Sequence, residues 1–111
     1  MKKQVYICAP LLGNIIKNIA RADRYQQYAI NCGVSPVSVH EDYRVVNWED
    51  KKQTQSALEN SLTKIWHSDE LWVMGEQITN RMRSEIEFCK EFNITVRYIC
   101  NKQFKEGKIP E

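Results

Sequence analysis

The stretch QVYICAPLLGN, residues 4–14, decides the fold because it joins a buried strand to the start of a helix. Residues 4–9 are mostly apolar and do not alternate with polar residues, which is typical of a parallel strand covered on both faces. Pro10 ends this run, and Asn14 opens a helical pattern that continues to Cys32, just before Gly33. The chain therefore begins as a strand followed by a crossover helix.

The same alternation continues to residue 99. Further strands are predicted at 35–40 (SPVSVH), 70–74 (ELWVM) and 94–99 (ITVRYI), and further helices from Asp50 to about Ser68 and from about Arg81 to Phe92. This βαβαβαβ order predicts an α/β fold with right-handed crossovers. We expect a Rossmann-like three-layer α/β/α sandwich around a four-stranded parallel sheet of order 2-1-3-4.

Apolar residues at helical spacing predict the helix faces that pack on the sheet. On the first helix these residues are Ile15, Ile19, Ala22 and Ala29, widened by Ile16, Ala20 and Tyr25. On the second helix they are Ala57, Leu58, Leu62, Ile65 and Trp66. Lys17, Arg21 and Arg24 are predicted to form a solvated face of the first helix.

Length and composition limit the organisation of the protein. Its 111 residues suit one domain spanning 1–111, because cores usually divide only beyond ~250 residues. Residues 102–111 are predicted to be a polar tail, and the segment from residue 100 onward shows no helical or strand pattern. The dispersed cysteines Cys8, Cys32, Cys89 and Cys100 lack the paired spacing of disulfide or zinc scaffolds, so all four are expected to be buried thiols.

Charge and hydropathy exclude several classes of partner. The formal net charge is only +2, which does not favour a nucleic-acid polymer. No apolar run approaches the ~20 residues that span a bilayer, and the opening MKKQ is not a signal peptide. We therefore expect a cytoplasmic protein without membrane contact. With only His40 and His67, far apart in sequence, no metal site is predicted.

The ligand site is predicted from topology. In open α/β sheets the crevice lies at the carboxyl ends of the strands where the strand order reverses, here between the first and third strands. The loops 10–14 and 75–80 border that position. Neither a G-x-G-x-x-G motif nor a Walker loop is present, so ordinary dinucleotide or ATP chemistry and a cofactor are not expected.

Five residues near the predicted strand ends could carry chemistry: Tyr6, Cys8, His40, Thr79 and Glu85. A carboxylate at Glu85 could attack a sugar anomeric carbon, although a glutamate near a helix N-terminus is also favoured by the helix dipole alone. His40 could bind a phosphate or base, or serve as a local hydrogen-bonding residue. Tyr6 could equally be a core aromatic residue with a satisfied hydroxyl.

Five segments resemble the nucleoside 2-deoxyribosyltransferase-like superfamily. They are VYICAP (5–10), NIARADRY (18–25), SPVSVH (35–40), SDELWVMG (68–75) and ITNRMRSEIE (78–87). Within that superfamily the pattern is most similar to a group of small bacterial and phage domains of unknown function. The resemblance runs from about Val5 to Tyr98 and implies a nucleoside or nucleotide ligand.

The resemblance also implies roles for particular residues. Glu85 matches the helix glutamate that is the nucleophile of deoxyribosyltransferases and 2′-deoxynucleoside 5′-phosphate N-hydrolases, and Tyr6 and His40 match their strand-one tyrosine and ligand-binding histidine. Two departures are evident: the relatives' catalytic aspartate falls near Ser61, and a glycine of their S-x-G-M motif is Arg81. Their fifth strand and the serine lent by a neighbouring subunit have no counterpart after residue 100.

These observations leave three functions open: cleavage or transfer at an N-glycosidic bond, non-catalytic binding of a nucleotide-derived signal by a sensor or phage-type sequestering protein, and a structural protein with a vestigial pocket. The predicted catalytic residues are Glu85 and Tyr6. The predicted ligand-binding residues are Cys8, Ala9, Pro10, His40, Gly75, Thr79, Arg81 and Met82. Arg81 is expected to attract an anion, and the chain is expected to form at least a homodimer.

Overall fold

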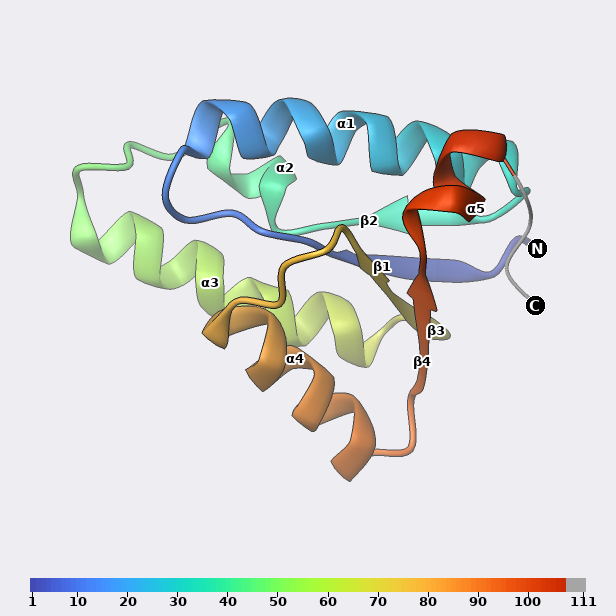
Figure 1. Ribbon diagram of the computed structural model, residues 1–111. Helices are drawn as coiled ribbons and strands as arrows, with labels where there is room; N and C mark the ends of the chain where they lie inside the picture. The colour runs from blue at the N-terminus through green and yellow to red at the C-terminus, as the bar shows by residue number, and fades with distance from the viewer. Residues whose placement is uncertain (108–111) are drawn as a thin grey trace.

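The computed structural model describes residues 1–107 and contains a four-stranded parallel sheet of order β2-β1-β3-β4 (Figure 1). The strands are β1 (Gln4–Cys8), β2 (Ser35–Val37), β3 (Glu70–Met74) and β4 (Thr95–Ile99). The helices are α1 (Ile15–Asn31), α2 (His40–Tyr43), α3 (Lys51–Trp66), α4 (Asn80–Glu91) and α5 (Asn101–Glu106). The predicted α/β fold, its parallel sheet and its strand order are confirmed.

Each face of the sheet has its own apolar core, because successive side chains of β1 point to opposite faces. Val5, Ile7 and Ala9 pack with α1 and with Phe104 of α5 on one face. Tyr6 and Cys8 pack with α3 and α4 on the other. Helices therefore cover both faces, as the apolar strands require (Figure 1).

Side-chain caps fix where the long helices begin. The carboxylate of Asp50 accepts a hydrogen bond of 2.9 Å from the backbone N–H of Lys52 at the start of α3. The Thr79 hydroxyl does the same for Met82 at the start of α4, at 3.2 Å. Such caps satisfy backbone donors that have no partner within the helix, which sets the register of α4 and of the side chains it presents.

The second strand is shorter than predicted. It ends at Val37, and His40, expected at a strand end, instead opens the short helix α2 within the predicted loop. Val39 and Tyr43 lie four residues apart and are both buried in a small core with Leu11. A helical turn places both side chains on the same side of the chain, where they are buried together. This packing outweighs the preference of the β-branched residues for a strand at this edge of the sheet.

The predicted polar tail is wrong in its first part, since residues 101–106 form α5. Phe104 provides the reason, because its ring packs edge-on against Tyr25 with centroids 5.2 Å apart. Gly107 ends the helix in the left-handed conformation, with φ 66°. Residues 108–111 of the predicted tail lie outside the described residues.

Several residues expected in the core are exposed. Ile16 is 73% exposed and Trp66 is 57% exposed, because they lie at the edges of their helices' apolar faces. The exposed ring of Trp66 packs instead against Phe92 of α4, with centroids 5.3 Å apart. Of the four cysteines, Cys8 and Cys89 are buried as predicted, whereas Cys32 is half-buried and Cys100 is exposed. Within residues 1–107, no helix is long and apolar enough to cross a membrane.

Candidate functional site

Glu85 lies inside the protein beneath the first turns of α4. Its side chain is 2% exposed, and its carboxylate receives hydrogen bonds from two different elements. The Tyr6 hydroxyl of β1 donates to Oε2 over 2.8 Å, and the Cys8 thiol donates to Oε1 over 3.4 Å. The alternation of β1 explains this arrangement, because residues 6 and 8 both point toward α4.

Arg81 covers this carboxylate from the preceding turn of the same helix. Its Nη1 lies 2.8 Å from Glu85 Oε2, in an i,i+4 ion pair, and its Nη2 donates to the backbone carbonyl of Ala9. The Arg81 side chain is only 13% exposed. The cation that was expected to attract an external anion is thus already engaged by an internal carboxylate and a carbonyl.

The protonation chemistry of this cluster reflects its burial. Burial raises the pKa of the Tyr6 hydroxyl well above its usual value, and the Glu85 carboxylate raises it further. The same two causes raise the pKa of the Cys8 thiol. Burial lowers the pKa of Arg81, but the Glu85 carboxylate, together with smaller contributions from Tyr6 and Cys8, raises it overall. Tyr6 and Cys8 therefore act as neutral donors, and Cys8 is not a reactive thiolate.

His40 is also turned inward. It is 1% exposed, and its Nε2 donates over 2.9 Å to the carbonyl oxygen of Pro10. With the proton on Nε2, Nδ1 is an acceptor, and it has no partner among the described residues. Burial lowers the pKa of His40 to about 4, although the bond to Pro10 opposes this shift. His40 and Arg81 thus hold consecutive carbonyls of the loop after β1, those of Pro10 and Ala9.

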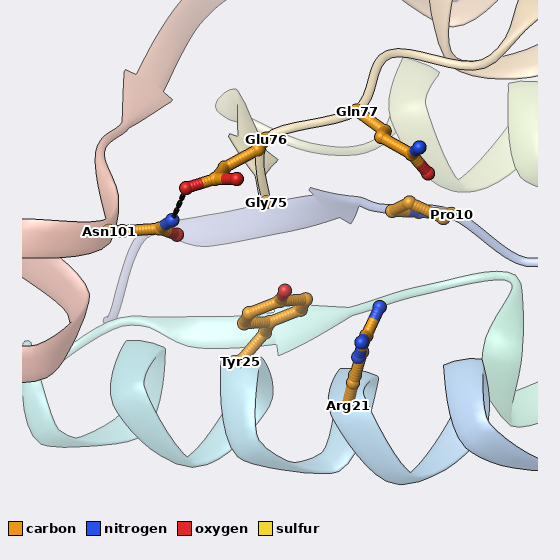
Figure 2. Close-up of a pocket in the computed structure, with 7 residues that line it drawn as sticks. All are labelled: Pro10, Arg21, Tyr25, Gly75, Glu76, Gln77 and Asn101. Carbon is orange, nitrogen blue, oxygen red and sulfur yellow. Dashed lines mark hydrogen bonds between the residues drawn. The ribbon is translucent and has the colours of Figure 1, made fainter.

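A polar cleft of about 480 Å³ opens beside this loop, on the α1 side of the sheet. Its lining side chains come from α1, the loops after β1 and β3, and the start of α5 (Figure 2). They are Pro10, Arg21, Tyr25, Gly75, Glu76, Gln77 and Asn101. The cleft therefore lies at the carboxyl ends of β1 and β3, where topology places ligands in open α/β sheets.

The wall that follows β3 depends on Gly75. Its φ is +89°, a left-handed conformation that side chains other than glycine rarely adopt. A Cβ at this position would also lie 3.3 Å from the Tyr25 hydroxyl oxygen. Figure 2 shows the Tyr25 hydroxyl directed toward this loop from α1. A glycine is thus required for Tyr25 and the loop to approach one another across the cleft.

The structure divides the residues predicted from sequence into two groups. Pro10 and Gly75 line the cleft. Tyr6, Cys8, Arg81 and Glu85 form the inner cluster, Met82 and Ala9 are buried beside it, His40 supports the loop after β1, and Thr79 caps α4. The hydroxyl of Ser61, near which the resemblance placed the relatives' aspartate, donates to the Leu58 carbonyl of its own helix over 2.7 Å.

Five cleft residues were missed: Arg21, Tyr25, Glu76, Gln77 and Asn101. Arg21 is exposed, as expected for a solvated helix face, but it also lies one turn before Tyr25 and shares the cleft with it (Figure 2). Their i,i+4 spacing and the placement of Tyr25 on the sheet-facing stripe could have indicated this. Asn101 could not have been found, because its position depends on the unpredicted helix α5.

No metal site accompanies the cleft in the part of the chain that the structure describes. Among residues 1–107, no three His, Cys, Asp or Glu side chains are grouped closely enough to hold a metal ion.

Comparison with known proteins gives one family and a shared fold. A family described as a domain of unknown function (DUF7768) matches residues 3–99, and no curated protein matches the chain. A 2-deoxyribosyltransferase from Bacillus psychrosaccharolyticus has a similar structure, with a TM-score of 0.65, 16% identity, and coverage of 95% of this chain and 82% of that one. A conserved protein from Enterococcus faecalis V583 has a TM-score of 0.62 and 18% identity; the alignment covers 88% of this chain but only 63% of that one. At such identities the likeness concerns the fold.

Proposed function

We propose that this chain, which belongs to the DUF7768 family, binds a small nucleoside- or nucleotide-type ligand in the polar cleft without cleaving it. The fold shared with a 2-deoxyribosyltransferase supports the ligand class, because open α/β sheets bind ligands at the carboxyl ends of their strands. Fold alone does not fix an activity, so the proposal depends on the side chains at those strand ends.

The observation that carries the proposal is the separation of Glu85 from the cleft. A nucleophilic carboxylate must reach the anomeric carbon, but Glu85 is 2% exposed and does not line the cleft. Its ion pair with Arg81 also neutralises the charge that would attack. The catalytic aspartate that the resemblance implies also has no counterpart near Ser61.

The cleft itself has groups suited to a polar ligand. Among residues 1–107, neither the Arg21 guanidinium nor the Tyr25 hydroxyl has a hydrogen-bond or ion-pair partner. A volume of about 480 Å³ falls within the range of roughly 300–1,000 Å³ typical of small-molecule sites. An arginine without a partner among the described residues favours an anionic ligand at a strand-end cleft, and a phosphate would satisfy its several donors.

Calorimetric titration of the purified protein with nucleosides and their 5′-monophosphates tests this proposal. We expect the monophosphates to bind more tightly than the nucleosides, and Arg21→Ala to remove most of that difference, about 1.5–3 kcal/mol for a lost charge-assisted contact. Arg24→Ala is the matched control, because Arg24 lies on the same helix but outside the cleft. If no nucleoside or nucleotide binds at high micromolar concentration, the proposal is wrong.

Cleavage of an N-glycosidic bond is a second candidate, favoured by the 2.8 Å hydrogen bond between Tyr6 and Glu85. That contact would orient a nucleophilic carboxylate if Arg81 moved aside. Chromatography for free base, after incubation with deoxynucleosides and their monophosphates, distinguishes the two functions. Base release that disappears in Glu85→Gln would replace the binding proposal with the enzymatic one.

A further inference from the structure

Opposite charges line the cleft without pairing across it. Arg21 projects from α1, whereas Glu76 lies in the loop after β3 on the facing wall (Figure 2). Within the described part of the chain no ion pair joins them. The cleft therefore presents donors on one wall and acceptors on the other, which suits a ligand with an anionic end and a separate hydrogen-bond-donating part.

Glu76 is held in place by Asn101. The Nδ2 amide of Asn101 donates to Glu76 Oε1, as the dashed line in Figure 2 marks. Because an ionised carboxylate only accepts hydrogen bonds, the amide nitrogen must face it, which leaves Asn101 Oδ1 as an acceptor. Glu76 Oε2 and Asn101 Oδ1 are thus two acceptors belonging to one hydrogen-bonded pair.

Two acceptors on neighbouring side chains match two adjacent hydroxyl groups. In dinucleotide-binding α/β folds, an acidic side chain at the strand ends accepts from a ribose hydroxyl in this manner. A phosphate cannot occupy this wall, because the Glu76 carboxylate would repel it. The charged end of a nucleotide is therefore directed to Arg21, and its sugar to Glu76 and Asn101.

We propose that the cleft selects a ribose-containing nucleotide over its 2′-deoxy counterpart, with Glu76 and Asn101 accepting hydrogen bonds from the 2′- and 3′-hydroxyls. This inference rests on the proposed function, because it assumes that a nucleotide occupies the cleft. Loss of the 2′-hydroxyl would remove one of the two hydrogen bonds to this pair of side chains, which reduces affinity.

Calorimetry with adenosine and guanosine 5′-monophosphates and their 2′-deoxy forms tests the inference. We expect the wild-type protein to bind each ribonucleotide about tenfold more tightly than its deoxy form. Glu76→Gln should lower this ratio to below about threefold, because glutamine keeps the size of the side chain but lacks the ionised acceptor. Glu87→Gln on the exposed face of α4 should leave the ratio unchanged.

The outcomes separate this inference from the proposed function. Equal affinity for ribo- and deoxyribonucleotides, with both still weakened by Arg21→Ala, would overturn ribose selection and leave nucleotide binding in place. A selectivity that persists fully in Glu76→Gln would also overturn the role of this wall. If none of the four nucleotides binds, both proposals are overturned.

Discussion

Replacing Arg81 by methionine should strongly destabilise the protein because it leaves a buried carboxylate without its cation. Glu85 is 2% exposed, and after the change it would keep only the Tyr6 hydroxyl and the weaker Cys8 thiol as donors. Removal of one partner from a fully buried ion pair costs about 3–5 kcal/mol. Because Arg81 itself is 13% exposed and water could replace part of it, we expect a loss near the lower end, about 3 kcal/mol.

The double variant isolates the interaction between the two side chains. Glu85→Gln alone should cost less, about 2 kcal/mol, because Arg81 keeps its bond to the Ala9 carbonyl and can reach solvent. When Arg81→Met and Glu85→Gln are combined, no unpaired buried charge remains. The total loss should then fall at least about 1.5 kcal/mol short of the sum of the single losses.

Urea unfolding of the four proteins, followed by circular dichroism, measures this coupling free energy. An equivalent cycle on the exposed pair Arg44–Asp23, whose side chains are 47% and 55% exposed, is the control and should give less than about 0.5 kcal/mol. A coupling at Arg81–Glu85 as small as that of the control would refute the view that Glu85 is neutralised inside the protein.

Three further predictions concern pH, the cleft loop and assembly. The pKa of His40 is about 4 in the folded protein and near 6.5 when unfolded, so the unfolded chain binds the proton more readily. Stability should therefore fall by up to about 3 kcal/mol as pH drops from 6.5 to 4, and His40→Gln should flatten this slope in urea titrations at several pH values. Gly75→Ala and Gly33→Ala should each lower the melting temperature, since both positions have positive φ. Only Gly75→Ala should weaken the binding of a cleft ligand, because a Cβ at Gly33 meets no atom. Equal ligand affinities of the two variants in calorimetry would contradict this. The exposed Trp66 surface of α3 should help form at least a dimer at micromolar concentration, and sedimentation of a 13.1 kDa monomer alone would disprove it.

Much of the fold could be predicted because it depends on local patterns. The apolar runs ending at Cys8 and Met74 can be buried on both faces only in a parallel sheet, and the helical stripes between them require crossovers on each side. The strand order and the position of the cleft agree with that topology. The predictions failed where a few long-range contacts outweigh local pattern, as at Phe104, which folds residues 101–106 into α5 against Tyr25.

The layers, the strand order and the edge of the sheet that carries the cleft could be predicted because hydrophobic periodicity is set by short stretches of the chain and the rules of parallel sheets restrict how those stretches assemble. Which polar groups remain available there depends instead on contacts between segments far apart in the chain. Tyr6 and Glu85 are 79 positions apart yet share a hydrogen bond, while Arg21 and Glu76 line one cleft without pairing. The i,i+4 spacing of Arg81 and Glu85 is visible in the sequence, but whether that pair lies in water or in a core depends on what packs over it. Burial determines the energetic consequences of each charge, and burial is a property of the assembled fold.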